Sequence, residues 1–168
     1  MTTPVLLLEL PHHEMVRLVR STDAPVFVAV NPVEFHGPHL SLHNDKLVTE
    51  GLSRDLYLRL AEHRSDFPFL VAHDLEMGAE PCSGPGTRHA PYQHLRQNLL
   101  ETVRALHEIG ARRIVINTFH GGGLHNLAIE EACRAFTAAG GRALGPLAIA
   151  LRAMVEFDAA LLDDAIET

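Results

Sequence analysis

Short apolar segments alternate along this chain with longer segments of helical periodicity, and this alternation limits the fold more than any other feature. We expect buried strands at 25–30, 69–72 and 114–116, where β-branched and apolar residues run without interruption. Helices are expected from Asp45 onward, over 92–109 and over 124–139, with a final strand near 147–151 and a terminal helix near 155–166. Such alternation predicts an α/β protein with a mostly parallel sheet covered on both faces.

Two of the expected helices have clear internal signals. In the first, Asp45 acts as a cap or lies just before one, and apolar residues follow at helical spacing, namely Leu47, Val48, Leu52, Leu56 and Leu60. The second carries the stripe Leu95, Leu99, Val103 and Leu106 and stops at Gly110. Both patterns favour helices that pack against a sheet.

Length and composition narrow the class of protein. The 168 residues, 46% of them hydrophobic and 21% charged, suit one globular domain over 1–168. A formal charge of -7 disfavours nucleic acid and leaves small molecules or proteins as partners. No stretch has the length of a membrane span and no signal peptide is evident, so we expect no membrane association and a cytoplasmic location. Cys82 and Cys133 are too few for a disulfide framework and are interpreted as buried or semi-buried thiols.

Two polar loops, 34–45 and 117–126, directly follow expected strands and should therefore open onto one crevice at the carboxyl ends of the sheet. Glu34 and His36 are two positions apart, so in extended backbone they point to the same side. Asp45 can fold back beside them and could bridge two ions, and His120 from the other loop supplies a fourth ligand. Mixed nitrogen and oxygen ligands suit Zn, Mn or a similar divalent ion, and a pair of ions would activate a bridging water.

Each of these residues also has an ordinary interpretation. The first loop could be a solvated loop with a helix cap, and His39 and His43 could be loop histidines instead of substrate or supporting groups. His120 could satisfy a strand-end hydrogen bond. The glycines at 121–123 are interpreted as a tight turn under the substrate, because no Gly-Lys-Ser/Thr follows to make a phosphate loop. His125 and Asn126 are alternatives for substrate contact, and Glu130 for an additional ligand.

Three motifs in this chain resemble those of the creatininase family. The run from Glu34 to Asp45, EFHGPHLSLHND, is similar to E-x-H-G-P-H-L-P-L-x-x-D, with Ser41 where Pro is usual. The run from Asn117, NTFHGG, is similar to N-G-H-G-G-N, with one residue inserted before His120 and Gly123 in place of Asn. Pro85-Gly86-Thr87 matches a P-G-T element between them. The motifs occur in family order and cover nearly the whole chain.

The resemblance implies a three-layer α/β/α sandwich and a dinuclear centre of Zn and/or Mn in a homo-oligomer. It implies hydrolysis of a small cyclic amide, formamide or related C–N bond. It assigns the metal to Glu34, His36, Asp45 and His120, with Asp45 as bridge, and points to His39, Gly121 and Gly122 for substrate binding. No catalytic residue is assigned. The family's further metal-binding Glu has no counterpart at Gly122, and we expect the chain to lack the family's C-terminal part. A catalytically inactive structural or regulatory subunit is therefore the alternative.

Overall fold

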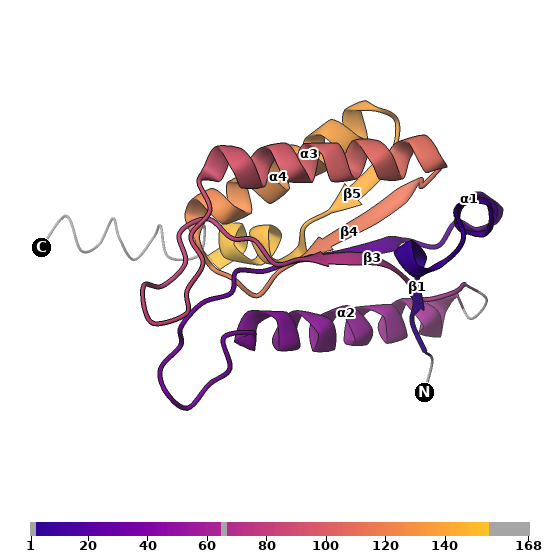
Figure 1. Ribbon diagram of the computed structural model, residues 1–168. Helices are drawn as coiled ribbons and strands as arrows, with labels where there is room; N and C mark the ends of the chain where they lie inside the picture. Colours follow the sequence, from indigo (N-terminus) through magenta and orange to yellow (C-terminus); the bar gives the residue numbers. More distant parts are fainter. Residues whose placement is uncertain (1–2, 65–66, 155–168) are drawn as a thin grey trace, which may run out of the picture.

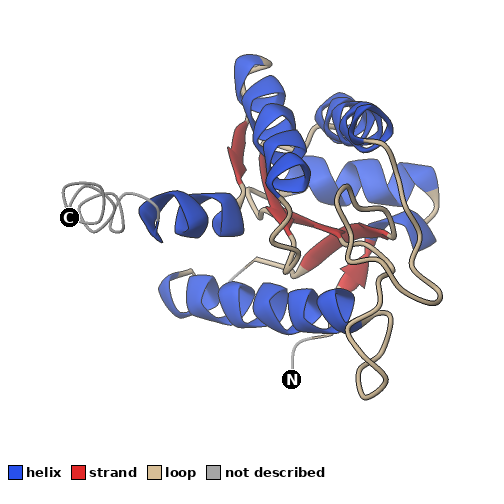
Figure 2. Cartoon of the chain, turned by 90° about the vertical axis from the view of Figure 1, so that its left-hand side faces the viewer, coloured by secondary structure: helices blue, strands red, loops and turns tan. Residues whose placement is uncertain are grey.

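The computed structural model describes residues 3–64 and 67–154, which form strands alternating with helices (Figures 1 and 2). The elements in chain order are β1 (Val5–Leu6), the 3-10 helix η1 (Leu7–Glu9), α1 (His12–Ser21), β2 (Val26–Val30), α2 (Asn44–His63), β3 (Leu70–Leu75), α3 (Tyr92–Ile109), β4 (Arg113–Asn117), α4 (Gly123–Ala138) and β5 (Arg142–Leu144).

The strands form one five-stranded sheet in the order β1-β3-β2-β4-β5, and every neighbouring pair is parallel. The predicted α/β class with a mostly parallel sheet is confirmed. β2 lies in the middle, with Val26 opposite both Leu70 of β3 and Ile114 of β4. Because side chains alternate along a strand, the central strands supply core to both faces of the sheet.

Helices cover the two faces unequally (Figure 1). On one face α3 packs against α4, and α1 packs against α3. Their core includes Val28, Val30 and Ile116 from the sheet and Leu99 from α3. On the other face α2 lies alone over a smaller cluster of Phe27, Tyr57, Phe69 and Val115, in which the Tyr57 and Phe69 rings stack at 4.6 Å. The result is the three-layer arrangement that the family resemblance implied.

The topology fixes where the two polar loops meet. The chain leaves β2 toward α2 on one face and leaves β4 toward α4 on the opposite face, although β2 and β4 are neighbours. In a parallel sheet, adjacent strands whose connections depart to opposite faces leave a crevice at their carboxyl ends. Residues 31–43 and 118–122 fill that position.

Helix α2 forms where the periodicity predicted it, but only part of its apolar stripe faces the sheet. Leu56 and Leu60 pack against the apolar cluster, whereas Leu47 and Leu52 are exposed. The fully buried positions of α2 are Asp45, Thr49, Ser53 and Tyr57. Polar contacts add to this packing, because Ser53 Oγ accepts from Asn117 Nδ2 at 3.0 Å and the Tyr57 hydroxyl donates to the Phe67 carbonyl at 3.1 Å. Asp45 is the second residue of the helix and makes no capping bond; His43 is the N-cap.

The strand predicted near 147–151 is wrong. The sheet ends with β5 at Arg142–Leu144, and residues 146–154 are helical. Pro146 stands at the first position of this helix, where its fixed φ favours helix and its missing N–H costs nothing. The predicted terminal helix near 155–166 lies outside the described residues. The short β1 and helix α1 were not predicted.

Candidate metal centre

The loop that follows β2 is held in place by the segment that follows β3. Glu34 N donates to the Leu42 carbonyl at 3.1 Å, which closes the loop on itself. Thr87 Oγ1 accepts from Phe35 N at 2.9 Å and donates to the Cys82 carbonyl at 2.9 Å. Gly86 has a φ of +87°, and a Cβ there would lie 2.7 Å from Leu42. The Pro-Gly-Thr element therefore fixes the backbone that presents Glu34.

Four predicted ligands from two loops and one helix end lie together. Glu34, Asp45 and His120 each offer one ligand atom, and these atoms all lie within 4.8 Å of one another. His120 Nδ1 is 3.1 Å from Glu34 Oε1 and 3.5 Å from Asp45 Oδ2. His36 Nε2 is 3.1 Å from Glu34 Oε1 and 3.2 Å from Asp45 Oδ1. Two carboxylates and two imidazoles thus face one small volume.

The outer nitrogen of each imidazole lies against a backbone carbonyl. His36 Nδ1 is 3.3 Å from the Glu34 carbonyl oxygen, and His120 Nε2 is 2.9 Å from the Ala79 carbonyl oxygen. A carbonyl can only accept, so once the inner nitrogens bind an ion the outer nitrogens would carry the hydrogen and donate to these carbonyls. The inner nitrogens then keep their lone pairs for an ion, which is how metal-binding histidines are usually oriented.

Burial makes this cluster costly without a cation. Glu34 and Asp45 are 2% and 3% exposed, and Asp45 Oδ2 has no hydrogen-bond partner among the described residues. Burial alone would raise the pKa of Asp45, but the neighbouring imidazoles of His120 and His36 lower it. Burial alone would lower the pKa of His120, but the neighbouring carboxylates of Asp45 and Glu34 raise it. The donors therefore fit a divalent cation that prefers mixed nitrogen and oxygen ligands.

A buried polar network that the sequence did not reveal connects the loops behind the cluster. Asn31, at the end of β2, is 1% exposed. Its Oδ1 accepts from Thr49 Oγ1 at 2.8 Å, from Thr118 Oγ1 at 3.4 Å and from Phe119 N at 3.4 Å, and its Nδ2 donates to Asp74 Oδ1 at 3.3 Å. One side chain thus connects α2 with β3 and with the segment that follows β4. In the sequence, the available signal for this network was an Asn directly after an expected strand.

His125 lies beneath His120. It is fully buried on α4, and the two rings meet edge to face with centroids 4.9 Å apart. Its Nε2 is 3.3 Å from Thr118 Oγ1. Burial and the charge of His120 lower the pKa of His125 to about 3, so it stays neutral at physiological pH. His125 and Asn126 therefore support the His120 loop from below, and Asn126 Nδ2 donates to the His120 and Gly122 carbonyls at 2.9 Å each.

The other candidates divide by their position. His39 is exposed and lies against Gly37, while His43 Nε2 is 3.5 Å from Glu76 Oε1 and so faces a neighbouring acidic residue. Gly121 and Gly122 follow His120 directly, with no turn assigned there, and Gly122 is the N-cap of α4. Glu130 is not at the centre, because its carboxylate pairs with Arg134 and Arg152 at 2.6 Å each.

The two cysteines differ in exposure. Cys82 is exposed, which corrects its expected burial, and its backbone N donates to Glu34 Oε2 at 2.6 Å. Cys133 is partly buried, as expected.

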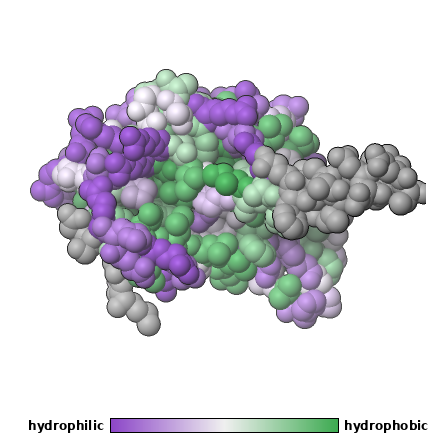
Figure 3. Space-filling model, turned by 180° about the vertical axis from the view of Figure 1, so that it is seen from behind, coloured by the Kyte–Doolittle hydropathy of each residue, from purple (hydrophilic) through white to green (hydrophobic). Residues whose placement is uncertain are grey.

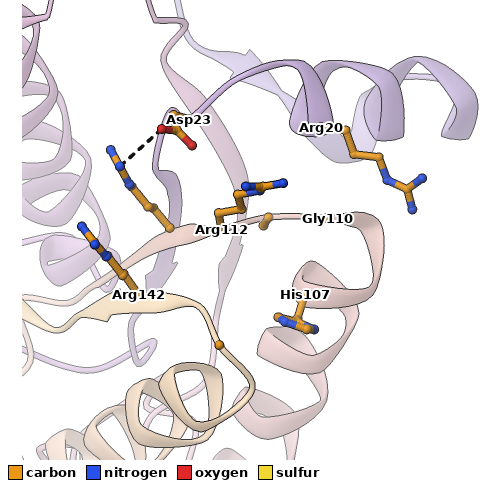
Figure 4. A pocket seen from close by; sticks show the side chains of 9 residues that line it. Arg20, Asp23, His107, Gly110, Arg112 and Arg142 are labelled. Carbon is orange, nitrogen blue, oxygen red and sulfur yellow. Dashed lines mark hydrogen bonds and ion pairs between the residues drawn. The ribbon is translucent and has the colours of Figure 1, made fainter.

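A large pocket of about 630 Å³ lies at the opposite end of the sheet, near the amino ends of β4 and β5 (Figure 4). Arg20, Arg112 and Arg142 line it, but their guanidinium groups point in different directions. The pocket also adjoins the C-terminal ends of α1 and α3, and Arg20 Nε donates to the Ile109 carbonyl at 3.1 Å. This pocket lies at the end of the sheet opposite to the ligand cluster, and it is not part of the candidate metal centre.

The fold and the ligand cluster define a class: a three-layer α/β protein with a candidate divalent-metal centre where the loops after β2 and β4 meet. A comparison with protein families then identifies the family. The sequence profile of the creatininase family, described as creatinine amidohydrolase, matches residues 9–165. The chain belongs to the creatininase family.

Solved structures agree on the fold. A crystal structure of creatinine amidohydrolase is 24% identical with a TM-score of 0.64, covering 83% of this chain and 56% of its own. A manganese form of creatininase is 24% identical with a TM-score of 0.62, covering 86% and 57%. A mutant creatininase of the Zn-Zn type is 21% identical with a TM-score of 0.62, covering 85% and 57%. This chain thus spans little more than half the length of these relatives.

Two further findings are negative, one from a comparison with curated proteins and one from the helices of the structure. No curated protein matches this chain. Within residues 3–64 and 67–154, no helix has both the length and the apolar character needed to cross a bilayer.

Proposed function

We propose that this chain is a metal-dependent amidohydrolase that cleaves a C–N bond in a small cyclic amide, formamide or related amide. The observation that carries the proposal is the orientation of both imidazoles: their inner nitrogens face Glu34 and Asp45, and their outer nitrogens face backbone carbonyls. Membership of a family described as creatinine amidohydrolase supports the reaction class.

Glu34, His36, Asp45 and His120 would hold the metal, and Asp45 would bridge two ions. The contacts of its two oxygens with different imidazoles support this role. When bound, divalent ions at such a site lower the pKa of a water and polarise a carbonyl. Zn and Mn are the proposed metals, since relatives exist in a manganese form and a Zn-Zn form. The buried surroundings of Glu34 and Asp45 keep competing water away from the ligands.

Substrate contacts are proposed at His39, Gly121 and Gly122. His39 is exposed at the tip of the loop that also carries His36. Gly121 has open space beside its Cα, so the backbone there can approach a bound molecule. The carboxylate of Glu80 already accepts from Leu124 N at 2.7 Å, so the amino end of α4 is not free for an anion. A neutral or cationic amide suits this surface better than a carboxylate.

The test compares Asp45→Asn with Asp55→Asn, a matched change of an exposed carboxylate on the same helix. The protein is loaded with Zn²⁺ or Mn²⁺ and assayed on a panel of lactams, cyclic ureas, creatinine and formamides. We expect Asp55→Asn to keep full activity and Asp45→Asn to lose at least about 100-fold, because removing a metal ligand exceeds the effect of its supporting groups. A metal-loaded wild-type protein that hydrolyses none of these amides contradicts the proposal.

One observation favours the second candidate, a catalytically inactive structural or regulatory subunit. Gly122 stands where the resemblance implies a further metal-binding Glu, and Glu130 lies elsewhere. Elemental analysis separates the two functions: about two divalent ions per chain support the hydrolase, and none supports the inactive subunit.

We also propose that the chain forms a homo-oligomer. Leu47, Leu52 and Leu58 are exposed on α2, and Figure 3 shows apolar side chains gathered in the middle of one face of the molecule. Exposed apolar patches of this kind commonly mark association surfaces. Light scattering on the purified protein measures the assembly directly, and a monomer at micromolar concentration refutes it.

A further inference from the structure

Residues 79–82, between β3 and α3, form a strap across the candidate metal centre. The Ala79 carbonyl oxygen is 2.9 Å from His120 Nε2, and Cys82 N donates to Glu34 Oε2 at 2.6 Å. Each end of the strap therefore contacts a different predicted ligand. No sequence motif pointed to this strap.

Glu80, between those two contacts, has an unusual backbone conformation. Its φ is 58°, and among the described residues it is the one non-glycine residue with a positive φ. This left-handed region is unfavourable for a residue with a Cβ, and such strain persists only where the surrounding structure holds it in place. The conformation turns the Ala79 carbonyl toward His120 and the Glu80 side chain toward α4.

The Glu80 side chain anchors the strained strap to α4. Its Oε2 accepts from Leu124 N at 2.7 Å, in the first turn of α4. Gly122, the N-cap of α4, has no side chain with which to cap the helix. A carboxylate on a free N–H at a helix amino end is a favourable, charge-assisted bond. Glu80 therefore ties the strap to the same loop that carries His120.

Gly122 leaves the space in which the Ala79 carbonyl and His120 come into contact. A Cβ at position 122 would lie 2.7 Å from His120 Nε2 and 3.1 Å from the Ala79 carbonyl oxygen. Any larger residue there would displace the contact between them. The glycine where the family resemblance implies a Glu is thus the residue that lets the strap approach His120.

We infer that Glu80 is a positioning residue that holds the Ala79 carbonyl on His120 Nε2, so that His120 presents its Nδ1 lone pair to the ion between Glu34 and Asp45. This inference rests on the proposed metal centre and deepens it. Glu80 acts through the strap and does not itself contact the reacting atoms. Supporting groups of metal-binding histidines typically change metal affinity by about 10–100-fold.

The experiment measures two quantities on Glu80→Ala, Glu80→Gln and the wild type. The first is Mn²⁺ or Zn²⁺ affinity by calorimetry. The second is the His120 tautomer in the metal-free protein, from ¹⁵N chemical shifts at a pH where the ring is neutral. We expect Glu80→Ala to weaken metal binding by about tenfold and to shift the neutral His120 ring away from the Nε2–H tautomer toward the Nδ1–H tautomer, for which the Glu34 carboxylate is the acceptor. Glu80→Gln keeps an uncharged acceptor, so its losses should be smaller.

Glu130→Ala is the matched control, because Glu130 also lies on the α4 side of the molecule but pairs only with arginines in the described structure. It should leave both quantities unchanged. Wild-type affinity and tautomer in Glu80→Ala overturn the inference, and so does a loss of affinity with an unchanged tautomer, which would mark a merely structural role. A protein that binds metal but hydrolyses no amide defeats the proposed function alone. If the wild type binds no ion, the tautomer measurement still decides the role of Glu80.

Discussion

Asn31 connects three segments around the candidate metal centre, and replacing it with leucine tests whether this network holds the fold together. Leucine has nearly the same shape but no polar atoms. Asn31→Leu removes the Asn31 partner of Thr49 Oγ1, Phe119 N and Asp74 Oδ1, whereas Thr118 Oγ1 keeps its contacts with His120 N and His125 Nε2. A buried group left without its partner costs about 1–3 kcal/mol.

The lower end of that range applies to most of these contacts. The bonds to Phe119 and Asp74 are long, at 3.4 Å and 3.3 Å, and Lys46 Nζ still lies 3.0 Å from Asp74 Oδ2. At about 1 kcal/mol for each of the three groups, the expected loss is about 3 kcal/mol. That is a large part of a typical unfolding free energy of about 5–15 kcal/mol.

Urea unfolding followed by circular dichroism measures the effect. With a denaturant slope of about 2 kcal/mol per molar, Asn31→Leu should lower the midpoint by about 1.5 M. A double-mutant cycle then tests the contact with Asp74. Asn31→Asp alone sets two carboxylates against each other, whereas the pair Asn31→Asp with Asp74→Asn restores a donor and an acceptor with their roles exchanged. The pair should recover at least about 1 kcal/mol relative to the sum of the single changes. A loss below about 1 kcal/mol for Asn31→Leu, or no coupling in the cycle, refutes the reasoning.

Three further predictions concern metal-induced stabilisation, the two glycines after His120 and the two thiols. Mn²⁺ or Zn²⁺ at 100 times its dissociation constant should stabilise the protein by about 2.7 kcal/mol and raise Tm by several degrees in calorimetry, and no shift would argue against a native metal centre. Gly122→Ala should weaken metal binding, since its Cβ would lie 2.7 Å from His120 Nε2, whereas Gly121→Ala meets nothing within 4 Å and should bind like the wild type. Burial raises the pKa of Cys133 from 9.0 to about 11, so the folded state retains this proton longer than the unfolded state and loses stability as pH rises between these values. Alkylation followed by mass spectrometry should accordingly modify the exposed Cys82 at pH 8 and spare Cys133 until the chain unfolds.

Local patterns predicted the central elements well. Helix α3 begins and ends where its stripe and Gly110 placed it, and Gly110 adopts the left-handed conformation expected of a helix stop. The expected strands at 25–30 and 114–116 match β2 and β4 within one residue at each end. These segments are buried on both faces or carry a continuous apolar stripe, so their signal is strong in sequence alone. The β1 strand of two residues offers too short a pattern to detect.

Helix α2 shows where pattern reasoning was incomplete. Leu56 and Leu60 of its apolar stripe pack against the sheet cluster, yet the fully buried positions are Asp45, Thr49, Ser53 and Tyr57. Polar groups can be buried there because the ends of β2 and β4 provide partners, such as Asn31 for Thr49 and Asn117 for Ser53. Those partners lie 18 and 64 positions away in the sequence, so no local period reveals them.

The sequence by itself determined the alternation of the central strands and helices, the parallel sheet, the family and the four residues proposed to bind metal, because local spacing or short motifs encode each of these. Only the tertiary structure decided how those residues are supported. The carbonyl of Ala79 on His120, the carboxylate of Glu80 on α4 and the Asn31 network all join segments far apart in the chain. Hydrogen bonds form between groups that folding brings within about 3 Å, and sequence distance carries no record of that proximity.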